Sequence, residues 1–553
     1  MDQLTKGWIW PVIVIIIAAC GHRKGQPQQK EIVKDIRQLD EVVPEQIAER
    51  LDYIAGNEGA MEDSIAVFRL SALTHAYQVN RGAAIWSRNG KEHPAAASMM
   101  RWIKTADDYG LVPGLLHVKA LSAAALQLET DAAAGRDAAL WARVDVLLTD
   151  AFLKMAYQLH YGVAPRDSIT LRKDSLLTDE VLTGLMQDAL GLGDVSSVMQ
   201  RQEPGHAGYA ALKEGVQQFK QQYGNKRWDT LPQQYTDTPL FQQQLAIRLV
   251  QSGHLDSSLV TDPATLRNAV RNFQREFNIY PDGVAGKQTV QLLNKQPSDW
   301  LLQAALNLDR WRKLPDTLPE RYLIVNIPAF RMTVLENEDT VLDSRVIVGA
   351  PRTRTPVLNS VMTNFILYPY WRVPYSIVFK EMLPQIRKDP YYLVEKNLEV
   401  VNHQGEVVNP DSIDWNKLGR KYFPYVLRQM DGLDNSLGIM KFNFFNKYSV
   451  YLHDTNNRTL FSNSNRALSH GCVRVQQWDS LAMYMVREDP DPAMRDSVRT
   501  WLEREEKRQY NLVKRLPIYV RYFTAEVRYG RMQFYEDIYG EDKALRQYFT
   551  FDK

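Results

Sequence analysis

Two residues near the C-terminal end of the chain have the types and the setting that nucleophilic catalysis requires. Cys472 lies in Ser-His-Gly-Cys-Val-Arg-Val at 469–475, and His453 lies upstream in Tyr-Leu-His-Asp-Thr. An ordinary thiol is only a few per cent ionised at neutral pH, so a cysteine nucleophile needs a histidine or another cation beside it. The pair therefore predicts a cysteine acyltransferase.

Two histidines are candidates for the base that activates this thiol. The run from Tyr448 to His453 is typical of a strand, which would place His453 at a strand end beside the loop that carries Cys472. His470 shares that tight loop, where side chains two residues apart tend to diverge. We therefore assign the base to His453. We expect His470 to shape the loop or contact the substrate, with a plain hydrogen-bonding role as the alternative.

The other cysteine, Cys20, follows an apolar run that extends from Trp8 to Ala19. The run is shorter than the about 20 residues that span a bilayer and has the length of a secretory signal. Ile-Ala-Ala-Cys-Gly resembles a bacterial lipoprotein signal, in which cleavage exposes the cysteine and its thiol is acylated; an uncleaved membrane anchor is the alternative. A lipidated Cys20 leaves Cys472 without a disulfide partner, which favours a catalytic thiol.

Length and composition are those of a multidomain globular protein. The 553 residues suffice for three or four domains, and 45% hydrophobic with 24% charged residues is ordinary. The formal net charge of only +2 argues against a nucleic-acid partner.

The first half of the chain has the pattern of helices. Residues 20–40 are polar and predict a tether, and residues 41–235 predict a helical domain in which apolar side chains recur at 3.6-residue spacing, for example between 146 and 160. The simplest role for that apolar stripe is packing. We assign no chemistry to this region.

Residues 236–296 predict a small helical unit. Apolar residues from Leu266 to Phe277 share one helix face, Pro281-Asp282-Gly283 supplies a turn, and a second helix follows from Thr289. The pattern from Phe273 to Asn294 resembles a peptidoglycan-binding domain. The alternative is that the helical pair only supports its neighbours.

The chain becomes rich in strands near residue 320. Tyr322–Leu335 and Val341–Gly349 are β-branched runs separated by a hairpin signal, so the domain that follows is expected to be mainly β. Residues 374–430 interrupt it just before the strand of His453. Their position favours a lid over the site, since lids exclude water from acyl intermediates; a surface excursion without a role is the alternative.

The two motifs around His453 and Cys472 resemble the signature of the L,D-transpeptidase catalytic domain. Val-Leu-Leu-Thr-Asp-Ala-Phe at 146–152, Tyr-Trp-Arg-Val-Pro-Tyr-Ser-Ile at 370–377 and Phe-x-x-Asp-Ile-Tyr-Gly at 534–540 extend the likeness. It implies a multidomain α+β fold: a signal at 1–19, the tether at 20–40, a helical scaffold at 41–235, a peptidoglycan-binding-like domain at 236–296, a connecting helix at 297–319, the catalytic domain at 320–545 with a capping insertion at 374–430, and a tail at 546–553.

The resemblance also implies a reaction that needs no metal and no cofactor. Cys472 would attack the carbonyl of the third residue, usually diaminopimelate, of a donor tetrapeptide stem and expel D-alanine. An acceptor stem's amine would then form a 3-to-3 cross-link. The thiol would also be acylated by carbapenems.

Other residues of the two motifs are given roles by this comparison. Amides near Gly471 and Cys472 would bind the oxyanion, and Ser469 would order the loop. Arg474 would hold a stem carboxylate or form a structural salt bridge. Tyr451 and Trp371 would line the substrate groove or belong to the core.

Three functions remain open at this stage. The chain is expected to be a transpeptidase, an L,D-carboxypeptidase whose acyl-enzyme reacts with water, or a non-catalytic wall-binding lipoprotein. In each case the expected partners are peptidoglycan stems and, through a lipid on Cys20, a membrane facing the periplasm. Gly21 follows Cys20 without an acidic residue, which favours the outer membrane.

Overall fold

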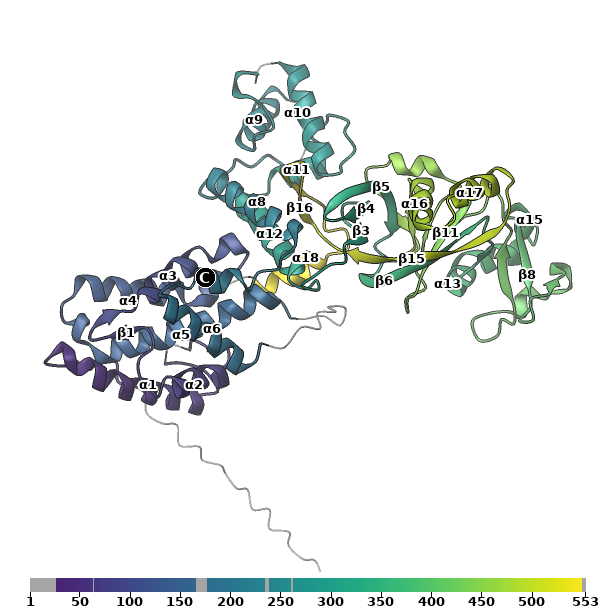
Figure 1. The fold of residues 1–553 in the computed structure, drawn as a ribbon. Coiled ribbons are helices and arrows are strands. Elements are labelled where there is room, and N and C mark those ends of the chain that lie inside the picture. Colours follow the sequence, from purple (N-terminus) through teal and green to yellow (C-terminus); the bar gives the residue numbers. More distant parts are fainter. Residues whose placement is uncertain (1–25, 63, 166–176, 234–237, 260–261, 550–553) are drawn as a thin grey trace, which may run out of the picture. The chain divides into compact units, whose positions relative to one another are not determined.

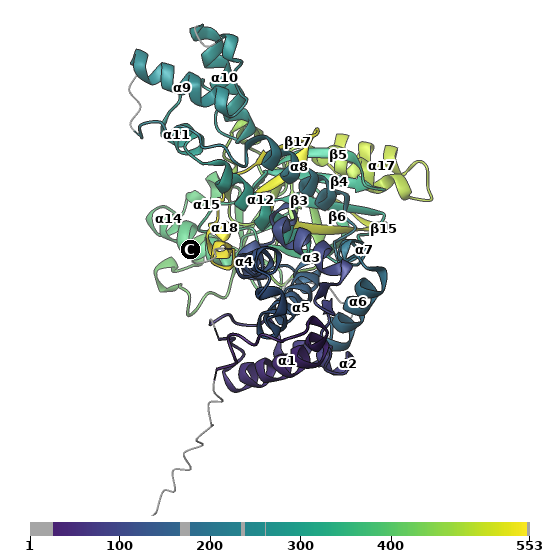
Figure 2. The same ribbon diagram turned by 90° about the vertical axis from the view of Figure 1, so that its left-hand side faces the viewer.

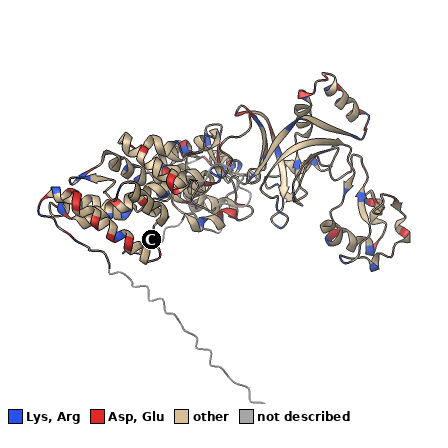
Figure 3. Ribbon diagram, turned by 60° about the horizontal axis from the view of Figure 1, so that its bottom comes forward, with Lys and Arg blue, Asp and Glu red and all other residues tan. Residues whose placement is uncertain are grey.

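The computed structural model describes residues 26–62, 64–165, 177–233, 238–259 and 262–549. The predicted signal and Cys20 lie outside these residues. The chain divides into two compact units, one made of Met1–Thr105, Pro113–Gln158 and Leu176–Gln202 and the other of Ala106–Val112, Leu159–Ser175 and Glu203–Lys553. Acidic and basic residues are interspersed throughout the described chain, as Figure 3 shows.

The first unit is helical, as predicted, with one short hairpin (Figures 1 and 2). Its elements are α1 (Leu39–Gly56), α2 (Leu70–Val79), β1 (Ser87–Arg88), β2 (Lys91–Glu92), α3 (Pro94–Lys104), α4 (Val118–Thr130), α5 (Ala138–Tyr161), α6 (Asp179–Leu192) and α7 (Ser196–Gln200). The apolar stripe expected between 146 and 160 lies on α5 and is buried, for example at Phe152 and Met155. Its packing role is confirmed.

The second unit begins with a helical region whose core includes a hairpin from the C-terminal end of the chain. The elements are α8 (Ala207–Tyr223), α9 (Pro239–Gln251), α10 (Pro263–Glu276), α11 (Lys287–Leu293), α12 (Pro297–Trp311), β16 (Ala525–Arg528) and β17 (Arg531–Phe534). Asp262 caps α10 by accepting from the amides of Ala264 and Thr265. The stripe predicted from Leu266 faces the core.

A buried glutamine fixes the turn between α10 and α11. The amide group of Gln274 donates to Asp282 and to the carbonyl of Val284, and its oxygen accepts from the N–H of Gly283. Gly283 has a φ of 80°, which favours glycine. The predicted helix, Pro-Asp-Gly turn and second helix are therefore confirmed.

The rest of the second unit is a mixed β-barrel. In the described chain nine strands have the order β13-β5-β14-β12-β11-β6-β15-β3-β4, and β5 also pairs with β4, so eight of them close on themselves. The strands are β3 (Arg321–Asn326), β4 (Arg331–Glu336), β5 (Asp339–Gly349), β6 (Leu358–Leu367), β11 (Met440–Phe444), β12 (Leu452–His453), β13 (Ala467–Ser469), β14 (Val473–Val475) and β15 (Arg508–Arg521). Helices α16 (Trp478–Met485) and α17 (Met494–Glu503) contribute to the barrel's core (Figure 1), and α18 (Glu541–Leu545) follows β17.

Two predicted strands differ in the structure. The run 322–335 is divided into β3 and β4, with Phe330 at a φ of 52° in the connection. The strand predicted from Tyr448 begins only at Leu452, because the side chain of Asn446 accepts from the N–H groups of Tyr448 and Val450 and holds a loop there. Ser449, at a φ of 57°, is incompatible with a regular strand.

Residues 371–429 fold as a subdomain with its own core, which we call the cap. In the described residues it has a four-stranded sheet of β7 (Trp371–Arg372), β10 (Val426–Gln429), β8 (Leu398–Val401) and β9 (Val407–Val408). Helices α13 (Tyr375–Ile377), η6 (Val378–Met382), α14 (Leu383–Lys388) and α15 (Tyr392–Glu395) cover it. No helix in the described ranges is long and apolar enough to cross a membrane.

Candidate active site

The loop that carries Cys472 joins β13 to β14 and is closed by a serine. The hydroxyl of Ser469 donates to the carbonyl of Cys472 at 2.6 Å and accepts from the amide of Gly471 at 3.1 Å. Gly471 has a φ of 118°, a conformation that other residues rarely adopt. Ser469 and Gly471 therefore fix the path of the backbone immediately before the thiol.

A second segment supports this loop from behind. Thr355 donates to the carbonyl of Gly471 at 2.8 Å, and Thr353 donates to that of Ser469 at 2.9 Å. The amide of Thr355 in turn donates to the hydroxyl of Tyr539, which donates to Gly349. Tyr539, from the motif at 534–540, thus helps to position the loop of Cys472 although it lies far away in sequence.

The register of β12 and β14 places four side chains on one face. Leu452 pairs with Val473 in parallel, and both are fully buried in the core. Because side chains alternate along a strand, the opposite face carries the residues on either side of this pair. These residues are Tyr451, His453, Cys472 and Arg474.

The thiol and the imidazole share this face without a hydrogen bond between them. The Cys472 sulfur instead lies 3.9 Å from the carbonyl oxygen of Ser449. His453 is buried, and its Nδ1 atom has no hydrogen-bond partner within the described chain. Cys472 is partly accessible to solvent. Because no hydrogen bond joins them, direct proton transfer requires one of the two side chains to move.

Both groups are neutral at rest. Burial raises the pKa of Cys472, an effect opposed by contacts with Tyr451 and by the charges of Lys441 and Arg474. Burial, together with the charge of Arg474, lowers the pKa of His453 to about 3. The resting site therefore does not hold a preformed thiolate and imidazolium pair, because both shifts favour the neutral forms of the two groups.

Arg474 is not held by a structural salt bridge in the described chain. Its nearest polar partner is the hydroxyl of Thr455, 3.5 Å away, and its Nε atom is buried without a partner. The neighbouring Asp454 is committed elsewhere, since it binds Arg458 and the amide of Ile439. A buried guanidinium with free donors can accept an anionic group of a substrate.

The oxyanion donors expected from the sequence are not equally available. The amide of Gly471 donates to Ser469, as described above. Among the described hydrogen bonds, none uses the amide of Cys472. The Cys472 N–H is therefore the donor that the loop leaves for a developing oxyanion.

Three regions of the chain match known protein families. Residues 71–215 match a scaffold domain, residues 236–293 match a family described as "Putative peptidoglycan binding domain", and residues 320–489 match the L,D-transpeptidase catalytic domain. The chain carries an L,D-transpeptidase catalytic domain. The matched region includes Cys472, His453 and the cap, whereas β15, which completes the barrel, lies beyond it.

A curated relative has the same description. A protein of Haemophilus influenzae named "Putative L,D-transpeptidase" is 37% identical over 264 residues, which cover 47% of this chain and 53% of that protein. The match thus spans about half the length of the relative.

The cap contacts the loop that carries Cys472 in the L,D-transpeptidase catalytic domain. Nε2 of His470 lies 2.7 Å from Oε1 of Glu381, which belongs to the π-helical turn η6. Both side chains are about half exposed. His470 therefore joins the loop to the cap, and it lies apart from the face that His453 shares with the thiol.

The predicted groove residues line a cavity of about 210 Å³ beside the thiol. Tyr451 and Trp371 both contribute to it, and Tyr451 interacts with Cys472 and Trp371. Lys441 lines the same cavity with its ammonium 4.3 Å from the centre of the Tyr451 ring. Lys441 was not predicted as a site residue; a lysine between the apolar residues Met440 and Phe442 was the available signal in the sequence.

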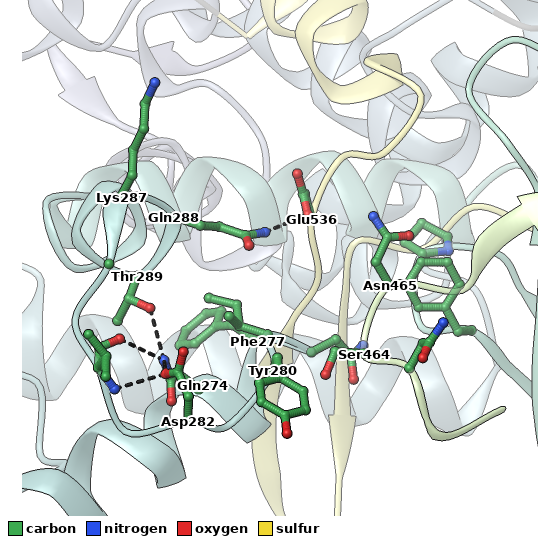
Figure 4. Close-up of a pocket in the computed structure, with 17 residues that line it drawn as sticks. Gln274, Phe277, Tyr280, Asp282, Lys287, Gln288, Thr289, Ser464, Asn465 and Glu536 are labelled. Atoms are coloured by element: carbon green, nitrogen blue, oxygen red, sulfur yellow. Dashed lines mark hydrogen bonds between the residues drawn. The ribbon is translucent and has the colours of Figure 1, made fainter. Parts of the chain in front are cut away.

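A larger cavity of about 560 Å³ lies between the α10–α11 region and the barrel. Phe277 and Tyr280 line it on one side and Ser464 and Asn465 on the other (Figure 4). The two sides are joined by a hydrogen bond from Gln288 to Glu536.

The described residues contain no cluster of His, Cys, Asp and Glu able to hold a metal ion.

Proposed function

We propose that this chain is a peptidoglycan L,D-transpeptidase that forms 3-to-3 cross-links through a thioester on Cys472. The observation that carries the proposal is the shared face of β12 and β14, where a partly accessible thiol lies beside a buried neutral imidazole and two cations. The matched catalytic domain supplies the reaction class.

The first step is acylation of the thiol. The Cys472 sulfur attacks the carbonyl carbon of the third residue of a donor tetrapeptide, and its proton passes to His453. The N–H of Cys472 stabilises the oxyanion. His453 then gives the proton to the amine of the departing D-alanine, so that the peptide bond breaks and the thioester remains.

The second step returns the enzyme to its starting state. The side-chain amine of an acceptor stem attacks the thioester carbonyl and loses a proton to His453. The C–S bond breaks, and the thiolate of Cys472 regains that proton. The cap, tied to the loop through His470 and Glu381, keeps water from the thioester and so favours the amine.

Product analysis tests the proposal directly. The purified full chain is incubated with tetrapeptide muropeptides, and the products are separated and identified by mass spectrometry. We expect 3-to-3 dimers, released D-alanine and a thioester on Cys472, all absent in Cys472→Ala. Tripeptide alone would establish the alternative, an L,D-carboxypeptidase. No product and no adduct from reduced protein would leave only a non-catalytic wall-binding role.

Two further properties belong to the proposal. A carbapenem adduct is expected on Cys472, because a thiolate that attacks a stem carbonyl also opens a strained lactam. The substrate places the enzyme in the bacterial envelope, where the region matched at 236–293 binds peptidoglycan and a lipid on Cys20 provides the anchor.

A further inference from the structure

The small cavity beside the thiol is lined by cations and aromatic rings. Its basic residues are Lys441 from β11, Arg372 from β7 and Arg428 from β10, and the aromatic walls are Tyr370, Trp371 and Tyr451. No acidic residue lines it. Barrel and cap therefore both contribute positive charge to one space of about 210 Å³.

Two of the cations have no counter-ion in the described chain. Arg428 pairs with Glu399, its neighbour on β8. Neither Lys441 nor Arg372 takes part in an ion pair among the described residues. Lys441 is partly buried, and burial lowers its pKa. Arg372 is exposed, so the cost of an unpaired, desolvated cation falls on Lys441, and an anionic ligand removes that cost.

The register of the cap's sheet adds an independent sign of ligand binding. Arg372 and Arg428 lie directly opposite each other on the antiparallel strands β7 and β10. Like charges in this position destabilise a sheet, although the pairing of Arg428 with Glu399 offsets part of the repulsion. Both nevertheless line the cavity next to Lys441.

We propose that this cavity, lined by Lys441 and Arg372, binds a free carboxylate of the donor stem peptide and so selects acidic over amidated stems. The proposal rests on the transpeptidase function and names a specificity site for it. The cavity is large enough for a carboxylate on a short alkyl chain, and its aromatic walls pack against that chain. The cationic groups converge on the head group.

The site is distinct in role from the oxyanion donor and from the base. A carboxylate held here fixes the stem on the Tyr451 side of the thiol, because Tyr451 interacts with Cys472 and also lines the cavity. Bound in this way, the stem presents its scissile carbonyl to the sulfur. Lys441 and Arg372 therefore act as positioning residues.

Binding to the full chain with Cys472→Ala separates this proposal from turnover. Calorimetry compares three tetrapeptides: one with all carboxylates free, one amidated on the side chain of its third residue and one amidated at its C-terminus. We expect one of the two amidated peptides to bind about tenfold to a hundredfold more weakly than the peptide with free carboxylates, which is the contribution of a charge-assisted hydrogen bond. The peptide affected identifies which carboxylate occupies the cavity.

Further variants assign the effect to the cavity. In the Cys472→Ala chain, a second substitution, Lys441→Gln or Arg372→Gln, should weaken binding of the acidic peptide by a similar factor. It should also abolish the preference for the acidic peptide over the amidated one. Lys388→Gln, on an exposed lysine of α14 outside the cavity, should retain it. Thermal unfolding of each variant at the wild-type temperature reports a folded chain.

Equal affinities of the three peptides, or a preference that survives both substitutions, would overturn the proposal. Turnover of the peptides by the wild-type chain is a separate measurement. Its absence would refute the transpeptidase function while the binding result still decided the role of the cavity.

Discussion

His453 lies directly opposite Arg474 in the parallel pair of β12 and β14, and Lys441 lies opposite His453 on its other side. The imidazole is therefore flanked by two fixed positive charges. Together with burial they keep its pKa at about 3. The neutral state of the imidazole is thus built into the register of three neighbouring strands.

Acid should destabilise the catalytic domain through His453. Between pH of about 6.5 and about 3 the unfolded imidazole binds a proton that the native one does not, so stability is full above this window and falls by about 1.4 kcal/mol per pH unit within it. Thermal unfolding of wild type and His453→Gln across this range measures the effect. A His453→Gln chain that loses as much stability as wild type would contradict it.

The same charges make a prediction for the thiol. Because burial raises the pKa of Cys472, its alkylation by iodoacetamide should accelerate as pH rises from about 7 to about 9. Arg474→Gln removes a charge that lowers this pKa, so the profile should move to higher pH. Rates measured by intact-protein mass spectrometry test this, and an unmoved profile would show that Arg474 does not act on the thiol.

The hydrogen bond between His470 and Glu381 should control the fate of the acyl-enzyme more than stability. A half-exposed pair contributes only about 0–1 kcal/mol. Glu381→Gln should therefore leave unfolding almost unchanged while it loosens the cap and raises the ratio of tripeptide to cross-linked dimer.

A matched control is the exposed pair of Asp496 and Arg499 on α17. Arg499→Gln removes a comparable surface interaction away from the loop and should leave the product ratio unchanged. If Glu381→Gln also leaves it unchanged, the contact is not part of the water barrier.

Local sequence patterns predicted the elements of the site well. The short-range signals around Cys472, including Ser469 and Gly471, specify a loop, because a glycine with positive φ and a side chain that bonds its own backbone act within a few residues. The peptidoglycan-binding-like turn was predictable for the same reason.

Long-range pairing is what the sequence could not supply. The support of Gly471 by Thr355 and Tyr539, and the row formed by Lys441, His453 and Arg474, depend on the register of strands far apart in the chain. The prediction that a strand begins at Tyr448 was wrong, because the side chain of Asn446 accepts the backbone N–H that a neighbouring strand would otherwise bind.

Substitution of Gly471 should disable the loop. With a φ of 118°, Gly471→Ala strains the backbone by about 1–3 kcal/mol, although its Cβ would lie at an ordinary contact distance of 3.4 Å from the carbonyl oxygen of Arg354. We expect thiol acylation to slow by at least tenfold. Gly191→Ala, at an open helical position of α6, is the control and should keep full activity. If Gly471→Ala is acylated at the wild-type rate, the loop can adopt a different backbone conformation at this position without loss of function.

Lipidation is testable independently of catalysis. Cys20→Ala should move the protein from the membrane fraction to the soluble periplasmic fraction, because acyl chains contribute about 0.8 kcal/mol per buried CH₂. Fractionation and the mass of the mature N-terminus measure this. If the chain stays uncleaved in the membrane fraction, its N-terminal apolar run is a membrane anchor and the protein is not a lipoprotein.

The cavity between the α10–α11 region and the barrel should be where intact peptidoglycan is held. Tyr280 is 68% exposed at its edge, and the buried Nδ2 atom of Asn278, which also lines it, has no partner in the described chain. An accessible ring and a free amide donor suit the apolar faces and the carbonyl groups of the wall polymer.

Tyr280→Ala should therefore weaken co-sedimentation of the full-length Cys472→Ala protein with purified sacculi several-fold. Tyr529→Ala removes a ring that is 86% exposed on the hairpin of β16 and β17 and should leave co-sedimentation unchanged. Acylation of Cys472 in a Tyr280→Ala chain that retains its thiol should proceed at the wild-type rate, since the two cavities share no lining residue. Equal binding of the two tyrosine variants would place the wall-binding surface elsewhere.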